Sequence, residues 1–331
     1  MLKIAVAGVG HLGQFHAGKF KNIAGASLAG VYDRNFARAT EIAQKLQVPA
    51  FASYEDMLAA CDAVDIAATT TAHYELAKPA LLAGKHIFLE KPITSELWQA
   101  EELLEIAASK NLKIQVGHIE RFNPVILRVE QDIGEPMFIE SHRLSTFHHR
   151  GTDVPVVLDL MIHDIDLILD FVHSPVTEIR ASGVGILTPS IDIANARIEF
   201  ANGAIANVTS SRVSMKQERK IRFFQRDSYI SMDFQAKQVR IMKKSANIMQ
   251  LLPQLMMGST DIKPEQLVDV ESIDVSDNPK DALTMELESF VDCIVNDRKP
   301  IVDGAAGTRA LDIALKIIAQ IQTKNKVLRG W

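Results

Sequence analysis

The stretch Leu2-Lys-Ile-Ala-Val-Ala-Gly8-Val-Gly10-His-Leu-Gly13 decides the fold of this chain. An apolar, strand-forming run enters the pattern G-x-G-x-x-G, and a helical pattern continues to about Lys21. In such a turn Gly8 permits the tight bend, Gly10 lets the backbone approach a pyrophosphate, and Gly13 lets the helix pack close to the strand. Free N–H groups at the start of the helix attract the anion. The stretch therefore predicts a dinucleotide-binding turn, with a glycine turn used only for packing as the alternative.

An acid stands at the end of the second predicted strand, residues 27–32. Asp33 follows Gly13 by 20 residues, which is the spacing of a ribose-binding acid in a dinucleotide site. Its carboxylate would accept hydrogen bonds from the adenosine ribose and repel a 2′-phosphate, so NAD is favoured over NADP. Arg34 weakens this preference, because an arginine at this place can bind the phosphate.

Strands and helices alternate through the first 120 residues. Further strands are predicted near residue 50 and at residues 63–68, 86–90 and 112–116, and helices at residues 35–46, 53–60, 71–82 and 95–109. This alternation predicts an α/β fold with a doubly wound parallel sheet, which we place at residues 1–120.

The segment His86-Ile-Phe-Leu-Glu90-Lys91-Pro92 is an apolar strand that ends in an acid, a base and a proline. In a parallel sheet the carboxyl ends of the strands open onto the crevice where ligands bind. Glu90 and Lys91 are therefore candidates for contact with a ligand, and Lys91 for a reacting group. The alternative is a solvated ion pair at the end of a strand.

A predicted helix at residues 156–172 is apolar on nearly all sides, which is typical of a buried helix. At about 100° per residue, most of its polar residues share an arc of roughly 60°. Buried charge is costly without a partner. Pairing inside the protein, contact with a substrate and a partial metal site all remain open, since Asp-x-x-x-His supplies only part of a metal-ligand set. The residues of the arc are Asp159, His163, Asp166 and Asp170, whereas Asp164 lies elsewhere.

The remainder of the chain predicts a second domain at residues 121–331. Strand patterns follow one another without intervening helices, and Asn202-Gly203 is a strong hairpin signal, so we expect an open, mostly antiparallel sheet. Two helices follow at residues 281–296 and 304–323, and we expect the last to pack back on the first domain. The strand patterns lie at residues 177–185, 194–200, 204–211, 220–224, 228–233 and 237–242.

Composition excludes several functions. With 331 residues and 47% hydrophobic content, the chain is large enough for two domains with sizeable cores. A net charge of -5 gives no electrostatic reason to expect a nucleic acid or an anionic membrane as partner. Cys61 and Cys293 lack C-x-x-C spacing, which favours the reducing cytoplasm. No leader sequence and no membrane-spanning apolar stretch is expected.

Four motifs in order resemble the Gfo/Idh/MocA oxidoreductase family from end to end: the Rossmann opening, Glu90-Lys91-Pro92, Gly117-His-Ile-Glu-Arg-Phe-Asn-Pro124 and Asp159-x-x-x-His163. The resemblance implies a Rossmann domain followed by an α/β domain with an open, mostly antiparallel sheet. More narrowly, residues 117–124, 150–154 and 159–166 are similar to the branch that oxidises the sugar 3-hydroxyl of UDP-N-acetylglucosamine.

The resemblance assigns the candidate site residues. Glu90 would bond the nicotinamide ribose, Thr70 and His73 would lie near the middle and nicotinamide end of the cofactor, and Asn123 would position a sugar hydroxyl. For His73 a purely local role in completing hydrogen bonds is the alternative. The predicted cofactor-binding residues are Gly8, Gly10, His11, Leu12, Gly13, Asp33, Arg34, Thr70, His73, Glu90 and Lys91. The predicted substrate-binding residues are Arg121, Asn123, Arg143, Arg150, Asp159 and His163.

Oxidation of a secondary alcohol requires a base that takes the hydroxyl proton while hydride leaves the same carbon. His163 is the predicted base, because histidine titrates near neutrality and Asp159 can orient it. Lys91 would stabilise the developing alkoxide, although the two roles can be exchanged. No catalytic metal is expected.

The sequence therefore predicts an NAD-dependent dehydrogenase for a small-molecule substrate, a nucleotide sugar oxidised at its 3-hydroxyl. A dehydrogenase for a free sugar, inositol or polyol is the alternative within the family. A regulator that senses NAD without turnover is the alternative from another class. From the family we also expect a homo-oligomer, either a dimer or a tetramer.

Overall fold

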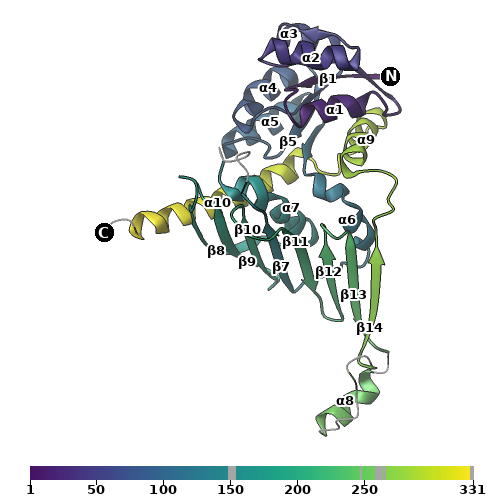
Figure 1. Ribbon diagram of the computed structural model, residues 1–331, viewed down its shortest axis with the longest axis vertical. Coiled ribbons are helices and arrows are strands. Elements are labelled where there is room, and N and C mark those ends of the chain that lie inside the picture. The colour runs from purple at the N-terminus through teal and green to yellow at the C-terminus, as the bar shows by residue number, and fades with distance from the viewer. Residues whose placement is uncertain (148–153, 247, 258–262, 264–265, 329–331) are drawn as a thin grey trace. The chain divides into compact units, whose positions relative to one another are not determined.

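The computed structural model describes residues 1–147, 154–246, 248–257, 263 and 266–328. The chain forms two compact units (Figure 1). The first unit contains Met1–Phe122 and Lys280–Asp312, and the second contains Asn123–Pro279 and Ile313–Trp331. Lys280–Asp312, placed in the second domain from the sequence, thus groups with the first unit.

The first unit is built on a six-stranded sheet in the order β3-β2-β1-β4-β5-β6, and every strand pair in it is parallel. The predicted doubly wound parallel sheet is therefore confirmed. Its strands are β1 (Leu2–Ala7), β2 (Ala26–Tyr32), β3 (Ala50–Phe51), β4 (Ala63–Ile66), β5 (His86–Glu90) and β6 (Ile114–Gly117). Its helices are α1 (Gly13–Phe20), α2 (Phe36–Leu46), α3 (Tyr54–Ala60), α4 (Thr70–Leu82), α5 (Leu97–Ser109), the 3-10 turn η1 (Ile119–Phe122) and α9 (Ala282–Val295).

Helix α9 explains why its segment belongs to the first unit. Its side chains Leu287 and Phe290 are fully buried in the same hydrophobic core as Ile4 and Phe88. The rings of Phe88 and Phe290 meet edge to face, with centroids 5.8 Å apart. A helix patterned only as amphipathic gives no indication of which core it joins, and this is why the sequence placed it in the wrong domain.

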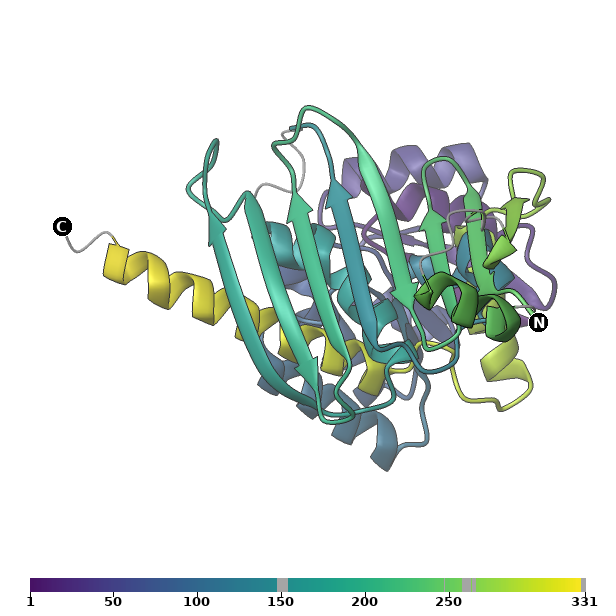
Figure 2. The same cartoon turned by 90° about the horizontal axis from the view of Figure 1, so that it is seen from below.

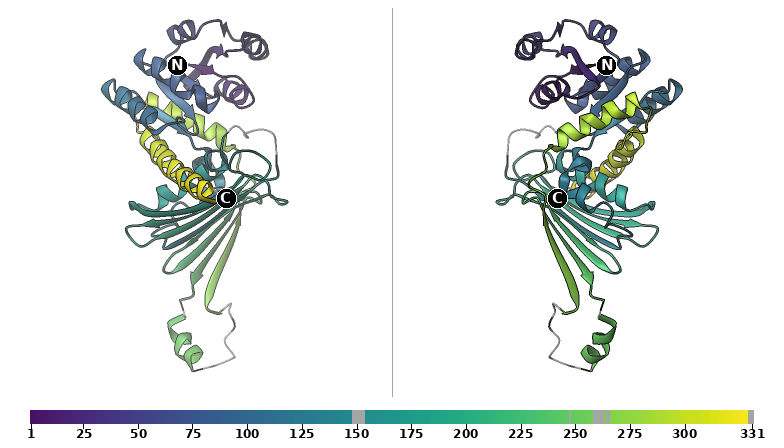
Figure 3. Two further views of the ribbon diagram at one scale, coloured as in Figure 1. Left: turned by 90° about the vertical axis from the view of Figure 1, so that its left-hand side faces the viewer. Right: turned by 90° about the vertical axis from the view of Figure 1, so that its right-hand side faces the viewer.

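The second unit contains an eight-stranded sheet in the order β14-β13-β12-β11-β7-β10-β9-β8. Only β7 and β10 pair in parallel, so the predicted mostly antiparallel sheet is confirmed. Figure 2 shows the strands side by side, and Figure 3 shows their twist. The strands are β7 (Phe138–Leu144), β8 (Val176–Val184), β9 (Ile193–Phe200), β10 (Ile205–Ser211), β11 (Glu218–Phe224), β12 (Ser228–Asp233), β13 (Gln238–Lys244) and β14 (Val268–Asp274).

Two of these strands, β7 and β14, were not predicted. The buried face of β7 consists of Ile139, Ser141 and Arg143, so a charged residue stands where the period-two pattern calls for an apolar one. Most of β14 is exposed at the edge of the sheet. The helices of this unit are α6 (Pro124–Val129), the π-helical turn η2 (Val157–Met161), α7 (Ile162–Phe171) and α8 (Ile248–Met256), and α10 (Gly304–Leu328) contains residues of both units.

The predicted regular helix at residues 156–172 is in fact two pieces. Val157–Met161 form a π-helical turn, and the α-helix begins only at Ile162. A π-helical turn takes more residues than an α-helical one, so the predicted angle of Asp159 about the axis is wrong. His163, Asp166 and Asp170 remain on one side of α7, because they stand three and four residues apart in regular α-helix.

None of the helices in the described part of the chain is long and apolar enough to cross a membrane.

Candidate active site

Four residues line up along the carboxyl edge of the parallel sheet. Ala7 pairs with Tyr32 and Ile66, and Ile66 pairs with Leu89. The next residue in each strand sequence therefore stands at the same edge, where ligands bind in open parallel sheets. These four residues are Gly8, Asp33, Ala67 and Glu90.

The glycine turn has the geometry that its sequence predicts. Gly8 has φ +88°, and a Cβ on it would lie 2.8 Å from the backbone of Ala68. A Cβ on Gly13 would lie 1.8 Å from the carbonyl oxygen of Gly8. At Gly10, by contrast, a Cβ would meet no atom within 4 Å. Packing therefore explains Gly8 and Gly13 but not Gly10, and we call the open space beside Gly10 the cradle. His11 and Leu12 continue the turn and are exposed.

Asp33 fixes the second strand end to this turn. Its Oδ2 accepts a hydrogen bond from Val9 N at 2.9 Å, and its Oδ1 accepts one from Asn35 N at 2.9 Å. Arg34 is exposed beside it. Arg38, which the sequence did not single out, donates from Nε to the carbonyl of Val9 at 2.9 Å. Its place one turn into a helix capped by Asn35 was the signal that could have found it.

His73 contacts two of the loops at this edge of the sheet. It is buried, with Nδ1 2.8 Å from the carbonyl of Pro92 and Nε2 3.2 Å from the carbonyl of Ala68. Burial lowers the pKa of this imidazole. Because both ring nitrogens face backbone carbonyls, His73 connects the loop after β4 to the loop after β5. These contacts fit a purely local role for His73 better than they fit a cofactor ligand. Thr70, at the start of α4, is half-buried.

Glu90 and the half-buried Lys91 end β5 as predicted. The Glu90 carboxylate contacts a buried histidine that the sequence did not single out: His16 Nε2 lies 3.3 Å from Glu90 Oε1, and His16 Nδ1 lies 2.8 Å from Asp65 Oδ2. The charge of Asp65 within the apolar strand Ala-Val-Asp-Ile was the signal that could have found this cluster.

In the second unit, Arg143 forms an ion pair with Asp164. Arg143 Nε lies 3.1 Å from both carboxylate oxygens, and Nη2 donates to Oδ1 at 2.7 Å. Both residues are buried, and Phe234 covers the guanidinium at 6.0 Å from its ring centroid. Arg143 is therefore better explained as the anchor of α7 on β7 than as a substrate-binding residue, which was its predicted role.

The other predicted residues lie on several elements of the chain. Asp159 and His163 are half-buried, and Asp166 is buried at 2% exposure. Arg121 is buried in η1, and Asn123 is the N-cap of α6, where its Oδ1 accepts from Val125 N at 3.0 Å. Capping thus gives Asn123 a structural role beside its predicted one. Arg150 lies outside the described residues.

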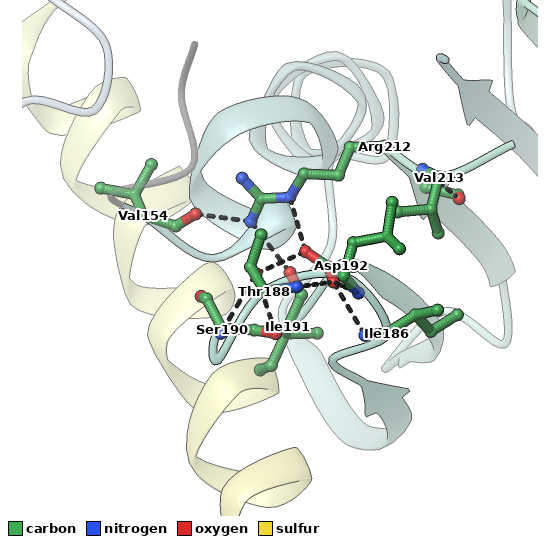
Figure 4. A network of polar contacts seen from close by, with 10 residues as sticks. Val154, Ile186, Thr188, Ser190, Ile191, Asp192, Arg212 and Val213 are labelled. Carbon is green, nitrogen blue, oxygen red and sulfur yellow. Dashed lines mark hydrogen bonds and ion pairs between the residues drawn. The ribbon is translucent and has the colours of Figure 1, made fainter. Parts of the chain in front are cut away.

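A second buried ion pair holds the chain just before η2 (Figure 4). Arg212 Nε lies 3.3 Å from Asp192 Oδ1, and Arg212 Nη2 donates to the carbonyls of Val154 at 2.6 Å and Ile191 at 3.0 Å. Asp192 Oδ2 accepts the backbone N–H groups of residues 186–188 at 2.7 to 2.8 Å. Burial raises the pKa of Asp192, but these hydrogen bonds outweigh it and hold the pKa below its ordinary value. The network therefore fixes the entry to the helix that carries Asp159.

Residues 2–118 match the oxidoreductase family described by its NAD-binding Rossmann fold, Gfo/Idh/MocA, and residues 127–228 match the Gfo/Idh/MocA C-terminal domain. The chain belongs to the Gfo/Idh/MocA family. It is thus an oxidoreductase with a nicotinamide cofactor, as its glycine turn indicated.

Relatives of this Gfo/Idh/MocA member are dehydrogenases. A UDP-N-acetylglucosamine 3-dehydrogenase from Acidithiobacillus ferrooxidans is 37% identical over 322 residues, which are 97% of each chain. The solved structure of that enzyme matches with a TM-score of 0.87 over 97% of this chain and 98% of the other. A scyllo-inositol 2-dehydrogenase (NAD(+)) from Bacillus subtilis is 24% identical over 95% of this chain and 92% of its own.

The residues of the first unit fit a dinucleotide. The open cradle at Gly10 admits a pyrophosphate, and Asp33 stands beside it. Glu90 lies at the end of β5, on the same edge of the sheet. Lys91 lies in the first unit and His163 in the second. The described residues contain no group of three or more potential metal ligands.

Proposed function

We propose that this chain is an NAD-dependent dehydrogenase that oxidises the 3-hydroxyl of UDP-N-acetylglucosamine or a closely similar UDP-N-acetyl sugar. The observation that carries the proposal is the 37% identity to a UDP-N-acetylglucosamine 3-dehydrogenase across 97% of both chains. A likeness of this extent covers both compact units, and so covers the residues proposed for cofactor and for substrate.

In the proposed reaction the C3–H bond breaks, the hydride leaves with its electron pair, and the 3-hydroxyl proton goes to a base as the carbonyl forms. The bound nicotinamide supplies the acceptor for the hydride. His163 takes the proton and Asp159, a turn earlier in the chain, supports the charged imidazole. Lys91 hydrogen-bonds the same oxygen and stabilises its developing negative charge.

Cofactor choice is proposed to rest on Asp33. Its carboxylate stands next to the turn that holds the pyrophosphate, and a 2′-phosphate at this place would meet a negative charge. This supports NAD over NADP. Arg34 is exposed, whereas two backbone N–H groups hold the Asp33 carboxylate in place, so Asp33 is the better-positioned determinant.

We also propose that the protein works as a homo-oligomer in the cytoplasm. Cys61 and Cys293 are both buried free thiols, which suits a reducing compartment. Size-exclusion chromatography with light scattering measures the oligomeric state directly.

Incubation of the purified protein with NAD and a panel of UDP-sugars, free sugars and inositols tests the substrate, with nicotinamide reduction followed at 340 nm. UDP-N-acetylglucosamine is expected to give the highest kcat/KM. Turnover of inositols or free sugars without turnover of UDP-sugars would refute the nucleotide-sugar assignment. NAD binding without turnover of any substrate would favour the sensing regulator.

Two variants test the proposed roles. Lys91→Ala and His163→Ala are expected to retain NAD binding and to lower kcat by a factor of about 100 or more. Lys110→Ala and His173→Ala are the matched controls, because both residues are exposed and lie at the ends of α5 and α7. Near-normal turnover of both site variants would contradict this assignment.

A further inference from the structure

A charged cluster is buried inside the first unit, beneath the carboxyl edge of its sheet. Asp65 on β4 is 0% exposed and His16 on α1 is 1% exposed. All four residues of β4 are buried, so the carboxylate of Asp65 stands in the core. Charge in such a place is costly unless it is paired. Packing of the core does not by itself require an acid at this position.

His16 connects Asp65 to Glu90. Its Nδ1 lies 2.8 Å from Asp65 Oδ2 and its Nε2 lies 3.3 Å from Glu90 Oε1. The ring of Phe88 stands edge to face against the imidazole, with centroids 5.6 Å apart. A neutral imidazole has one N–H and can donate to only one of the two carboxylates, whereas an imidazolium donates to both. The contacts therefore fit a charged His16 between two acids.

The second oxygen of Glu90 is also held. Lys91 N donates to Glu90 Oε2 at 3.1 Å. Gly117 on the neighbouring strand leaves room for the carboxylate, since a Cβ there would lie 3.0 Å from Glu90 Oε2. One donor at each oxygen fixes the plane of the carboxylate, and each oxygen keeps a second lone pair for a ligand.

We propose that His16 is a positioning residue for the cofactor. Together with Asp65, His16 holds the Glu90 carboxylate in an orientation in which it accepts hydrogen bonds from the hydroxyls of the nicotinamide ribose. This rests on the proposed function in one respect, which is that Glu90 faces the nicotinamide half of the dinucleotide. His16 itself is buried and touches no ligand. It acts through Glu90.

The electrostatics of the cluster agree with this role. Burial lowers the pKa of His16, but Asp65 and Glu90 outweigh it and raise the pKa well above its ordinary value of 6.5. Burial raises the pKa of Glu90, but the hydrogen bond from His16 and the charges of His16 and Lys91 hold it below its ordinary value. Burial raises the pKa of Asp65, and His16 only partly offsets this. Glu90 is thus the carboxylate that stays ionised.

We expect NAD affinity to depend on pH through this cluster. The groups that face His16 are Asp65 and Glu90, and Lys91 and His73 act on Glu90. The stabilisation from a charged His16 is complete below the ordinary histidine pKa of 6.5 and is lost as pH rises through the raised pKa of the folded protein. NAD affinity is expected to fall over the same alkaline range, because Glu90 then loses a donor.

The test separates charge from packing with a paired substitution. His16→Gln alone offers one donor end to two carboxylates, so its amide oxygen faces either Asp65 or Glu90, whereas His16→Gln with Asp65→Asn restores a neutral hydrogen-bonded pair of similar volume. His86→Gln is the control, since His86 is a half-buried histidine at the other end of β5, where Nδ1 accepts from Lys113 N. NAD binding to the purified protein is measured by calorimetry from pH 6 to pH 10, together with the ring-nitrogen chemical shifts of His16.

The double variant is expected to fold, to bind NAD about tenfold more weakly at neutral pH, and to lose the alkaline fall in affinity. The KM for the sugar is expected to stay within about twofold. Unchanged NAD affinity with an unchanged pH profile would overturn the proposal, as would ring-nitrogen shifts of a neutral His16 at pH 7. NAD binding needs no sugar, so failure of the substrate assignment would leave this test intact.

Discussion

Replacement of Asp164 by alanine tests whether the buried pair with Arg143 holds α7 on the sheet. The two side chains are only 2% and 5% exposed, and three N···O contacts of 2.7 to 3.1 Å join them. Removal of one partner of a buried ion pair costs about 3–5 kcal/mol, because the desolvated charge of the other partner loses that compensation. At roughly 2–4 °C per kcal/mol for a domain of about 150–250 residues, Tm is expected to fall by about 6–20 °C.

Urea unfolding followed by circular dichroism measures the loss of stability, and hydrogen exchange of the α7 amides shows whether the loss is local. The double variant Arg143→Met with Asp164→Leu is expected to be more stable than Asp164→Ala, because both members of the buried ion pair are then replaced by apolar side chains. Arg180→Ala is the control, since its pair with Glu178 is exposed and contributes about 0–1 kcal/mol.

A loss below about 0.5 kcal/mol for Asp164→Ala, similar to that of the exposed control, would refute the anchoring role. A double variant no more stable than Asp164→Ala would refute the account of the cost as stranded charge. Because His163 immediately precedes Asp164, kcat is also expected to fall in any variant that loosens α7.

Three further outcomes are expected. Gly10→Ala is expected to leave Tm unchanged but to raise the dissociation constant for NAD at least about tenfold, whereas Gly13→Ala is expected to lower both stability and binding, because its Cβ would lie 1.8 Å from the oxygen of Gly8. Calorimetry of binding and of unfolding measures both effects. A Gly10→Ala protein with normal NAD affinity would contradict the role of the cradle. Asp33→Asn raises the ratio of kcat/KM for NADP over NAD about tenfold, measured by steady-state kinetics, and an unchanged ratio would remove Asp33 as the determinant. Asp192→Asn lowers stability by about 1–3 kcal/mol in urea unfolding, because the amide nitrogen then faces either the backbone donors or Arg212; a neutral effect would contradict this reading of the network.

The chain's local patterns were sufficient for much of the fold. The glycine turn, the strand that ends in Glu90 and Lys91, and the hairpin at Asn202-Gly203 all depend on neighbours in the sequence, and the structure contains the strands that they predict. The same is true of the helix predicted at residues 53–60, which begins where the Ser53 side chain accepts from Asp56 N. Short-range sterics and hydrogen bonding determine such features, so a single sequence reveals them.

Contacts between distant residues were decided only by the tertiary structure. Nothing local indicates that Asp164 pairs with Arg143 on a strand with a polar buried face, and this is why Arg143 was first assigned to a substrate. The regular period assumed for residues 156–172 likewise failed at the π-helical turn, because its width depends on packing and not on propensity.

What the sequence by itself determined is the chemistry at one edge of the first sheet: a turn open to an anion at Gly10, an acid at Asp33, and an acid and a base at the end of β5. Only the folded chain brought His16 and Asp65 beneath that edge, from positions 49 residues apart in the sequence. The physical reason is that parallel pairing places the ends of remote strands side by side, so partners are selected by sheet order and helix packing and not by spacing along the chain.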